Sequence, residues 1–149
     1  MNIFGMTMTN QNFREYEVIM KLYHLSEDEN LTVLTPRIPK YAVGLFEDIS
    51  TPRVCFAKTI SGCLSALQDI PCTYYVYVPD EEVNIVVPTT NQVRDSKVNG
   101  EVWSLNPVKV KCKGIIKSYD YIKTKECIVN DDDYVTRFYY PWRWVKKYF

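Results

Sequence analysis

The stretch Arg53-Val54-Cys55-Phe56-Ala57-Lys58-Thr59-Ile60-Ser61-Gly62-Cys63-Leu64-Ser65-Ala66-Leu67-Gln68 decides the fold, because its pattern changes from that of a strand to that of a helix. Residues 53–57 are mostly apolar and include types that are enriched in strands. From Ile60 onward the apolar residues Ile60, Cys63, Leu64 and Leu67 recur at helical spacing. Thr59 precedes them and is a favoured N-cap residue. The stretch therefore predicts a strand that leads into a helix, and Pro71 should end that helix.

Short strand-like segments lie on both sides of this unit. Strands are predicted at residues 21–26, 31–34, 73–78, 82–87, 101–105 and 108–117. In the last of these, Val108, Val110 and Cys112 alternate with Lys109, Lys111 and Lys113, which is typical of a strand with one solvated face. Pro36 and Pro39 flank Arg37, so residues 35–40 should form an extended, exposed loop. Many short strands with one or two helices indicate the α+β class.

Length and charge limit the organisation of the chain. Its 149 residues, 46% of them hydrophobic, are enough for one sizeable core. We predict an N-terminal lead-in over residues 1–20 and a single domain over 21–149. Eighteen basic and eighteen acidic side chains give a formal net charge of zero, which makes nucleic acid an unlikely partner. The N-terminus does not resemble a secretion signal and no apolar run is long enough to span a membrane, so we expect a soluble, cytoplasmic protein.

The cysteines and the histidine limit the metal chemistry. Five cysteines occur without a Cys-x-x-Cys pair, which argues against a disulfide framework and against a structural zinc site. The chain has a single histidine, His24, so a multi-histidine metal centre is excluded. We expect buried free thiols and no metal. A nucleophilic pair of His24 and Cys55 lacks both a signature sequence and an orienting acid.

Two polar residues in strand-like segments are the candidates for chemistry. His24 lies within Leu22-Tyr23-His24-Leu25-Ser26, and Glu101 opens Gly100-Glu101-Val102-Trp103-Ser104-Leu105-Asn106-Pro107. A neutral imidazole offers one donor and one acceptor, and a carboxylate opposes developing positive charge. The alternatives are a structural histidine with satisfied hydrogen bonds and a charged residue at the exposed start of a strand.

The order of these motifs resembles the ADP-ribosyltransferase fold of the His-Tyr-Glu type. The resemblance runs from Leu22 to Gly114. It rests on Tyr23-His24-Leu25-Ser26 followed by Leu31-x-x-Leu34, on Arg53-Val54-Cys55-Phe56-Ala57 before a capped helix, and on Asn99-Gly100-Glu101-Val102-Trp103-x-x-Asn106-Pro107-x-x-Val110. It implies split antiparallel β-sheets with one or two helices.

The resemblance also implies a cofactor, NAD, and a role for each candidate residue. His24 would hydrogen-bond the adenosine ribose, and Glu101 would bind the ribose beside the nicotinamide and stabilise its oxocarbenium-like transition state. Tyr23, Leu25 and Ser26, on the same strand as His24, would contribute to binding the cofactor. Phe56, Tyr75 and Tyr77 are the candidate platforms for the nicotinamide ring, and Arg37 and Arg53 would neutralise the pyrophosphate. Asn99 stands two positions before Glu101, where family members that modify arginine carry an acidic residue or Gln, so arginine is not implied as the acceptor.

Two classes of function follow. The first is an enzyme that binds NAD and transfers ADP-ribose to an acceptor. The second is a non-catalytic factor of the same fold that binds a nucleotide or a protein, such as a small phage or mobile-element protein that inhibits a host defence system. At the C-terminus, Trp142-Arg143-Trp144-Val145-Lys146-Lys147 is compatible with base stacking but favours a closing strand with one buried face.

Overall fold

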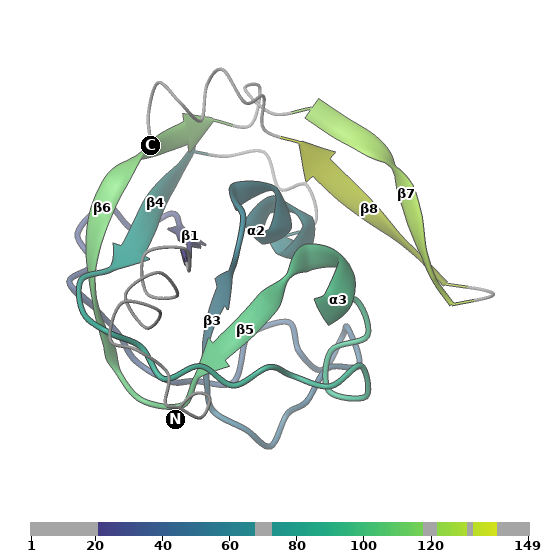
Figure 1. Cartoon of the computed structure of the whole chain (residues 1–149), viewed down its shortest axis with the longest axis horizontal. Helices are drawn as coiled ribbons and strands as arrows, with labels where there is room; N and C mark the ends of the chain where they lie inside the picture. The colour runs from purple at the N-terminus through teal and green to yellow at the C-terminus, as the bar shows by residue number, and fades with distance from the viewer. Residues whose placement is uncertain (1–20, 68–72, 118–121, 131–132, 140–149) are drawn as a thin grey trace, which may run out of the picture.

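The computed structural model describes residues 21–67, 73–117, 122–130 and 133–139. These residues form a mixed α and β architecture in which every strand pair is antiparallel. In chain order the elements are β1 (His24–Ser26), β2 (Val33–Leu34), β3 (Val54–Ala57), α2 (Ile60–Leu67), β4 (Thr73–Pro79), α3 (Ser96–Asn99), β5 (Glu101–Ser104), β6 (Val108–Lys117), β7 (Ile122–Asn130) and β8 (Asp133–Tyr139) (Figure 1). The predicted α+β class is confirmed at this level. The short helix α3 was not predicted.

The largest sheet has four strands in the order β1-β4-β6-β2. Between β4 and β6 the register shifts, since Val76 faces Gly114 whereas Tyr77 faces Cys112. Lys113 is therefore the extra residue of a β-bulge. Lys109, Lys111 and Lys113 are exposed, as predicted, but Cys112 is also exposed rather than turned inward. The expected burial of Cys112 was wrong: Cys112 keeps the side of the sheet that Val110 occupies, since the bulge follows it, but it is exposed there.

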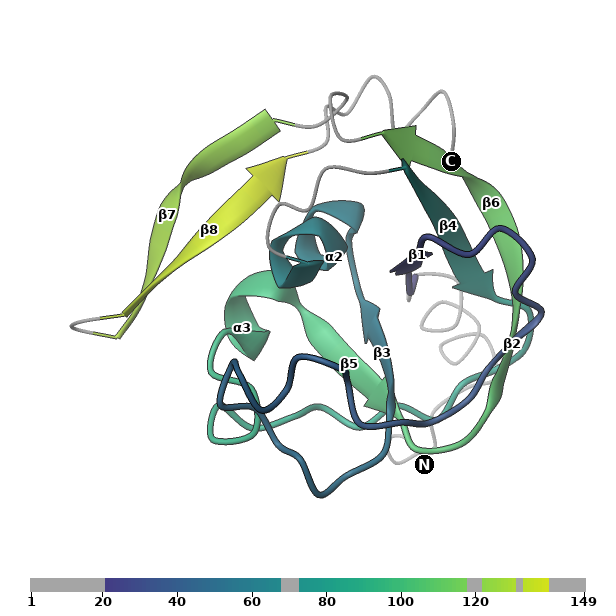
Figure 2. The ribbon, with the colours of Figure 1, turned by 180° about the vertical axis from the view of Figure 1, so that it is seen from behind.

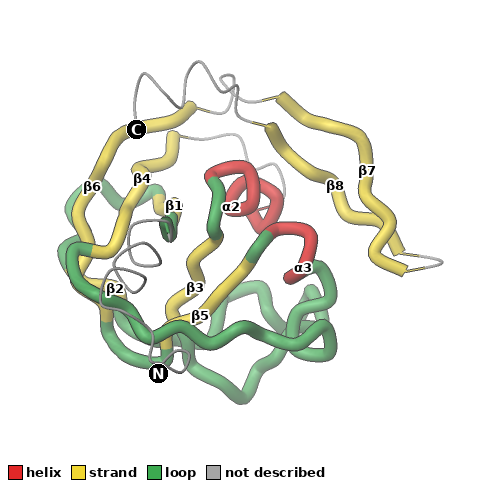
Figure 3. The backbone as a smooth tube through the Cα atoms, viewed as in Figure 1, coloured by secondary structure: helices red, strands yellow, loops and turns green. Residues whose placement is uncertain are grey.

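A second sheet pairs β3 with β5, and isolated bridges join it to the rest of the fold. Ala57 pairs with Tyr23 and Arg53 pairs with Arg37, both through reciprocal backbone hydrogen bonds. Residues two or four apart in a strand direct their backbone groups to the same edge. The segments before β1 and after β2 therefore meet the same edge of β3, and β5 occupies the other edge. Figure 3 shows β4 and β6 on one flank of the molecule and β3 and β5 facing them.

The strand predicted at residues 82–87 was wrong. Among the described residues, Val86 alone of this range is bridged, to Trp103 on the outer edge of β5. Further strand pairing along that edge is limited, because the Glu101 N–H already donates a hydrogen bond of 2.9 Å to the side-chain oxygen of Asn99. The rest of the range forms a loop in which Val87 is 66% exposed.

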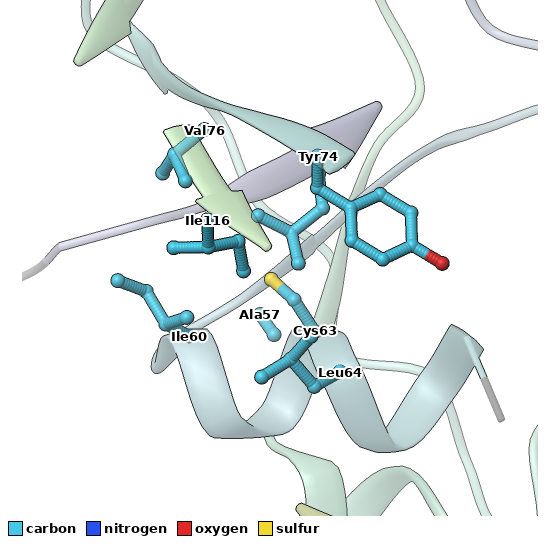
Figure 4. Close-up of a cluster of buried hydrophobic side chains, with 8 residues drawn as sticks. Ala57, Ile60, Cys63, Leu64, Tyr74, Val76 and Ile116 are labelled. Atoms are coloured by element: carbon cyan, nitrogen blue, oxygen red, sulfur yellow. The ribbon is translucent and has the colours of Figure 1, made fainter. Parts of the chain in front are cut away.

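The helix α2 forms as the sequence predicts. Thr59 Oγ1 accepts a hydrogen bond from the Gly62 N–H at 2.9 Å, which confirms the N-cap. The buried face of α2 packs against β1, β3, β4 and β6 in a cluster that contains Leu25, Ala57, Ile60, Cys63, Leu64, Tyr74, Val76 and Ile116 (Figure 4). The backbone of α2 also runs beside β8.

A second buried cluster fills the space between the two sheets. It contains Leu22, Leu34, Val54, Phe56, Tyr77, Val102, Val108 and Val110. Successive residues of β3 thus serve different cores: Val54 and Phe56 point between the sheets, and Ala57 points to the side of α2. This division of β3 positions the candidate site.

Asn130 pairs with Asp133 at the facing ends of β7 and β8. The lead-in over residues 1–20 and the C-terminal motif at 142–147 lie outside the described residues. Within the part that is described, no helix combines the length and the apolar character needed to cross a membrane.

Candidate functional site

The register of the strands divides the predicted site residues between two faces. His24 faces Tyr77 and Ser26 faces Tyr75 across β1 and β4, and directly paired residues project to the same side of a sheet. Phe56 reaches this side from β3, with its ring 6.2 Å from the imidazole of His24 in an edge-to-face arrangement. We call His24, Ser26, Phe56, Tyr75 and Tyr77 the His24 face.

Within the His24 face, depth separates the residues that a ligand can touch from those beneath. Phe56 and Tyr77 are 2% and 0% exposed, so they form the floor. The Tyr77 hydroxyl donates to the Asp28 carbonyl and accepts from the Leu31 N–H, which ties the 27–31 turn to β4. His24, Ser26 and Tyr75 are partly exposed and form the accessible layer.

His24 fills a gap between two strand segments. Its Nδ1 lies 2.8 Å from the carbonyl oxygen of Cys55, on the edge of β3 between the bridges at Arg53 and Ala57. A carbonyl only accepts, so Nδ1 carries the proton. Burial lowers the pKa of His24, and the nearby positive charge of Arg37 lowers it further, while the hydrogen bond to Cys55 partly opposes both. The ring is therefore neutral near pH 7, with Nε2 as an acceptor that has no partner among the described residues.

The positive charge of Arg37 acts on His24. It is exposed, and its backbone is held by reciprocal hydrogen bonds of 3.0 Å with Arg53. An exposed guanidinium on a fixed backbone presents donors that suit phosphate oxygens, although the bridge to Arg53 directs the Arg37 side chain to the side of β3 opposite Phe56.

The remaining predicted residues do not belong to the His24 face. Tyr23 and Leu25 alternate with His24 and pack into the cluster under α2. Arg53 and Glu101 lie on the face of β3 and β5 opposite Phe56, because Arg53 alternates with Val54 and Glu101 pairs with Ala57. Arg53 is 1% exposed and Glu101 is 8% exposed. The fold therefore does not bring His24 and Glu101 together on one ligand, although their strands are neighbours.

Glu101 belongs to a buried polar cluster. Its carboxylate accepts a hydrogen bond from the Trp103 indole at 2.7 Å. The Arg53 guanidinium stacks over the Trp103 ring, 4.3 Å from its centre, and donates to the carbonyls of Asp48 and Thr51. Arg53 Nη2 lies 3.6 Å from a carboxylate oxygen of Glu47. Arg53 thus holds the 47–51 loop rather than pointing towards a pyrophosphate near His24.

Burial sets the protonation of this cluster. It raises the pKa of Glu101, and the Trp103 hydrogen bond only partly opposes the rise. It also raises the pKa of Glu47 to about 7, with repulsion from Glu101 and Asp95 adding to the effect. Sequence reasoning did not single out Glu47 or Trp103. The sequence could have placed Trp103 beside Glu101, because residues two positions apart in a strand lie on the same face.

The thiols of Cys55 and Cys63 offer no nucleophile beside His24. Burial raises the pKa of both Cys55 and Cys63 to about 12, so both are protonated at neutral pH. The contact of His24 is with the backbone carbonyl of Cys55 and leaves no general base on the sulfur. The described residues hold no group of three or more His, Cys, Asp or Glu side chains that could bind a metal ion.

The comparisons with known proteins do not assign a family. A scan against protein-family models, a search of curated proteins and a search of solved structures each gave no match. The functional argument therefore depends on the geometry of this chain.

Proposed function

We propose that this protein binds a nucleotide of the nicotinamide dinucleotide kind, without transferring ADP-ribose. The observation that carries the proposal is the separation of the predicted binding residues from the predicted catalytic one. His24, Ser26 and Tyr75 share a partly exposed face on which the charge of Arg37 acts, whereas Glu101 is buried on the opposite face of the neighbouring strands.

The chemistry of the His24 face supports a ribose and phosphate ligand. With Nδ1 committed to the Cys55 carbonyl, the neutral ring offers Nε2 as the acceptor for a ribose hydroxyl. The Ser26 hydroxyl lies two residues along on the same side, and the partly exposed ring of Tyr75 offers a surface for a base. Arg37 supplies charge for a pyrophosphate.

The environment of Glu101 supports binding without catalysis. A carboxylate stabilises an oxocarbenium-like centre only when it lies beside the reacting carbon. The carboxylate of Glu101 is instead engaged by the Trp103 indole, and burial favours its neutral form. The strand pairing directs it to the side opposite His24, which supports binding without catalysis.

The alternative is an active ADP-ribosyltransferase, as the resemblance implies. One observation favours it: backbone hydrogen bonds join Tyr23, which directly precedes His24, to β3 and join β3 in turn to β5, which carries Glu101. A rearrangement of β5 that turns Glu101 over would be required for catalysis.

Calorimetric titration with oxidised NAD, combined with an assay for released nicotinamide, tests the proposal. We expect saturable binding that Arg37→Ala weakens at least tenfold, because the substitution removes the phosphate-binding fork without altering a buried side chain. Lys113→Ala, which removes an exposed cation from β6, is the matched control and should bind as the wild type does.

The outcomes separate the two functions. Binding without nicotinamide release supports the non-catalytic proposal. Release that is lost in Glu101→Gln would select the transferase instead. Absence of binding at millimolar NAD would rule out both.

A further inference from the structure

The face of β3 and β5 opposite Phe56 carries a buried arginine whose guanidinium is only partly hydrogen-bonded. Arg53 is 1% exposed, and its Nη1 donates to the carbonyls of Asp48 and Thr51. Its Nε and Nη2 have no hydrogen-bond partner among the described residues. Buried polar atoms are nearly always hydrogen-bonded, so two such atoms on one side chain require an explanation.

The two atoms lie on one edge of the Arg53 guanidinium. The Nε–H and one N–H of Nη2 point in the same direction, and this edge matches the two oxygens of a carboxylate or of a phosphate group. The guanidinium is held in place, because it stacks over the Trp103 ring 4.3 Å from its centre and because Nη1 is bonded to two carbonyls. A donor pair that is ordered before binding loses little entropy when an oxyanion binds.

Glu47 lies beside this edge without forming a hydrogen bond to it. Its Oε1 is 3.6 Å from Arg53 Nη2, which is an ion-pair distance but longer than a hydrogen bond. The carboxylate of Glu101 accepts a hydrogen bond from the Trp103 indole instead. Burial and the neighbouring carboxylates raise the pKa of Glu47 to about 7, so below that pH Glu47 is mostly neutral while Arg53 keeps its charge. A buried charge without a paired counter-ion is costly, which favours the binding of an anion.

Two residues beside Arg53 reach solvent. The Glu47 side chain is 19% exposed, whereas that of Arg53 is 0% exposed. Cys55 projects to the same side of β3 as Arg53 and is partly exposed. The charges of Arg53 and Glu101 both act on the Cys55 thiol, so the thiol lies close to both, but sulfur is only a weak acceptor. Figure 2 shows β3 and β5 side by side, with the segment between β2 and β3, in blue, crossing in front of β5.

We propose that the Nε and Nη2 edge of Arg53 binds a small oxyanion, a carboxylate or a phosphate group, that enters between Glu47 and Cys55. The anion accepts the two hydrogen bonds that no described residue supplies and neutralises the buried guanidinium. The site lies on the side of β3 opposite Phe56 and the His24 face, so it is independent of the proposed nucleotide binding.

Binding at this edge should depend on the charge of Glu47. The groups that face Glu47 are Glu101 from β5, Asp95 from the segment before α3, and Arg53 and Cys55 from the region of β3. Glu101 and Asp95 repel a negative charge on Glu47, and Arg53 attracts it. An oxyanion on Arg53 adds a further negative charge, so it binds best when Glu47 is neutral. The affinity should therefore fall as the pH rises through 7.

Calorimetric titration of the purified full chain with sulfate and, separately, with acetate tests the proposal at pH 6 and pH 8 and at constant ionic strength. Each probe has nearly the same charge at both pH values, so a change in affinity reports on the protein. We expect saturable binding of at least one probe at pH 6 and binding about tenfold weaker at pH 8, because Glu47 changes from mostly neutral to mostly ionised. Tighter binding of sulfate assigns a phosphate-like ligand, and tighter binding of acetate assigns a carboxylate.

Glu47→Gln is the central variant, because glutamine is neutral at every pH. It should bind the probe at pH 8 as tightly as the wild type does at pH 6. Glu82→Gln makes the same change in net charge at an exposed position, so it is the matched control and should keep the pH dependence of the wild type. Arg53→Lys keeps the positive charge but lacks the two-donor edge, and it should weaken binding at pH 6 at least tenfold.

Circular dichroism shows whether Arg53→Lys is folded. Undiminished binding by folded Arg53→Lys overturns the proposal. If that variant does not fold, the comparison of Glu47→Gln with Glu82→Gln decides. Tight binding at pH 8 by Glu47→Gln alone supports the site, and equal affinities for the two variants place the anion elsewhere and overturn it. A wild-type chain that binds neither probe at pH 6 also overturns it, and makes Glu47 the internal partner of the Arg53 edge.

Discussion

His24 stabilises the fold through one ring nitrogen. Its Nδ1–H donates a hydrogen bond to the Cys55 carbonyl. That carbonyl lies on the edge of β3 between two backbone bridges, one from Arg53 to Arg37 and one from Ala57 to Tyr23. The structural role that the sequence left open for this histidine is therefore present, and it leaves Nε2 without a partner among the described residues. The residue type alone could not decide between a structural role and a ligand-binding role, because Nδ1 serves the fold and Nε2 remains available for a ligand.

His24→Ala should lower the free energy of unfolding by about 1–2 kcal/mol at pH 7.5, because the Cys55 carbonyl loses its donor. The pKa of His24 is below its ordinary value of 6.5 in the folded state. The unfolded chain therefore binds the proton first as the pH falls, and the stability from the neutral ring is lost below about pH 6.5.

Urea titrations of wild type and His24→Ala at pH 7.5 and pH 5 measure this effect. The difference in stability between the two proteins should shrink at pH 5. A difference that is the same at both pH values would show that the ring is not held neutral by the fold.

At the scale of elements, α2 was predictable in its position and its cap but not in its contact with α3. The apolar spacing and Thr59 are local signals. Gly62, by contrast, reads as a residue that weakens a helix. In the structure a Cβ at Gly62 would lie 1.9 Å from the backbone oxygen of Asn99 at the end of α3, so the glycine permits the close approach.

Gly62→Ala should destabilise the protein by about 2–3 kcal/mol, because the methyl group must displace the backbone of α3 and the start of β5. The sign is opposite to that expected for glycine to alanine in an ordinary helix. Thermal unfolding followed by circular dichroism measures it. Gly44→Ala is the control, since its nearest neighbour would be the Tyr41 backbone oxygen at 3.8 Å. Equal unfolding temperatures for the two variants would contradict the close contact.

The predicted strand at residues 82–87 does not form, and the reason is again a contact that local sequence does not show. An alternating apolar pattern forms a strand only when a neighbouring edge has free backbone groups. The edge of β5 is already partly occupied by the Asn99 side chain, which is close in sequence but recognisable only from the turn it adopts.

At the scale of the whole molecule, the buried cluster around Arg53 joins three distant segments. Glu47 and Asp48 come from the 47–51 loop, Arg53 from the position just before β3, and Glu101 and Trp103 from β5. The cluster places more carboxylates than cations in a poorly solvated region, and the pKa of Glu47 is raised to about 7 as a result.

Glu47→Gln should change the pH dependence of stability. The folded state holds the Glu47 proton up to about pH 7, whereas the ordinary pKa is 4.5. The contribution of this group therefore favours folding below pH 4.5 and is lost as the pH rises from 4.5 to 7. Relative to the variant, the wild type should lose stability over that window in urea titrations. Glu82→Gln is the control. It changes an exposed carboxylate in the loop after β4, and its pH dependence of stability should follow that of the wild type. Parallel curves for Glu47→Gln and wild type would contradict the raised pKa.

The sequence by itself determined the α+β class, the strand and capped helix of residues 53–67, and most of the strands, because those properties depend on spacing, capping and turn chemistry over a few residues. The tertiary structure decided which side chains meet. His24 and Glu101 lie on neighbouring strand systems, yet the pairing of Tyr23 with Ala57 and of Ala57 with Glu101 sends them to opposite faces. A shift of one residue in either pairing would reverse that outcome, and register is set by the packing of both cores together rather than by any local pattern.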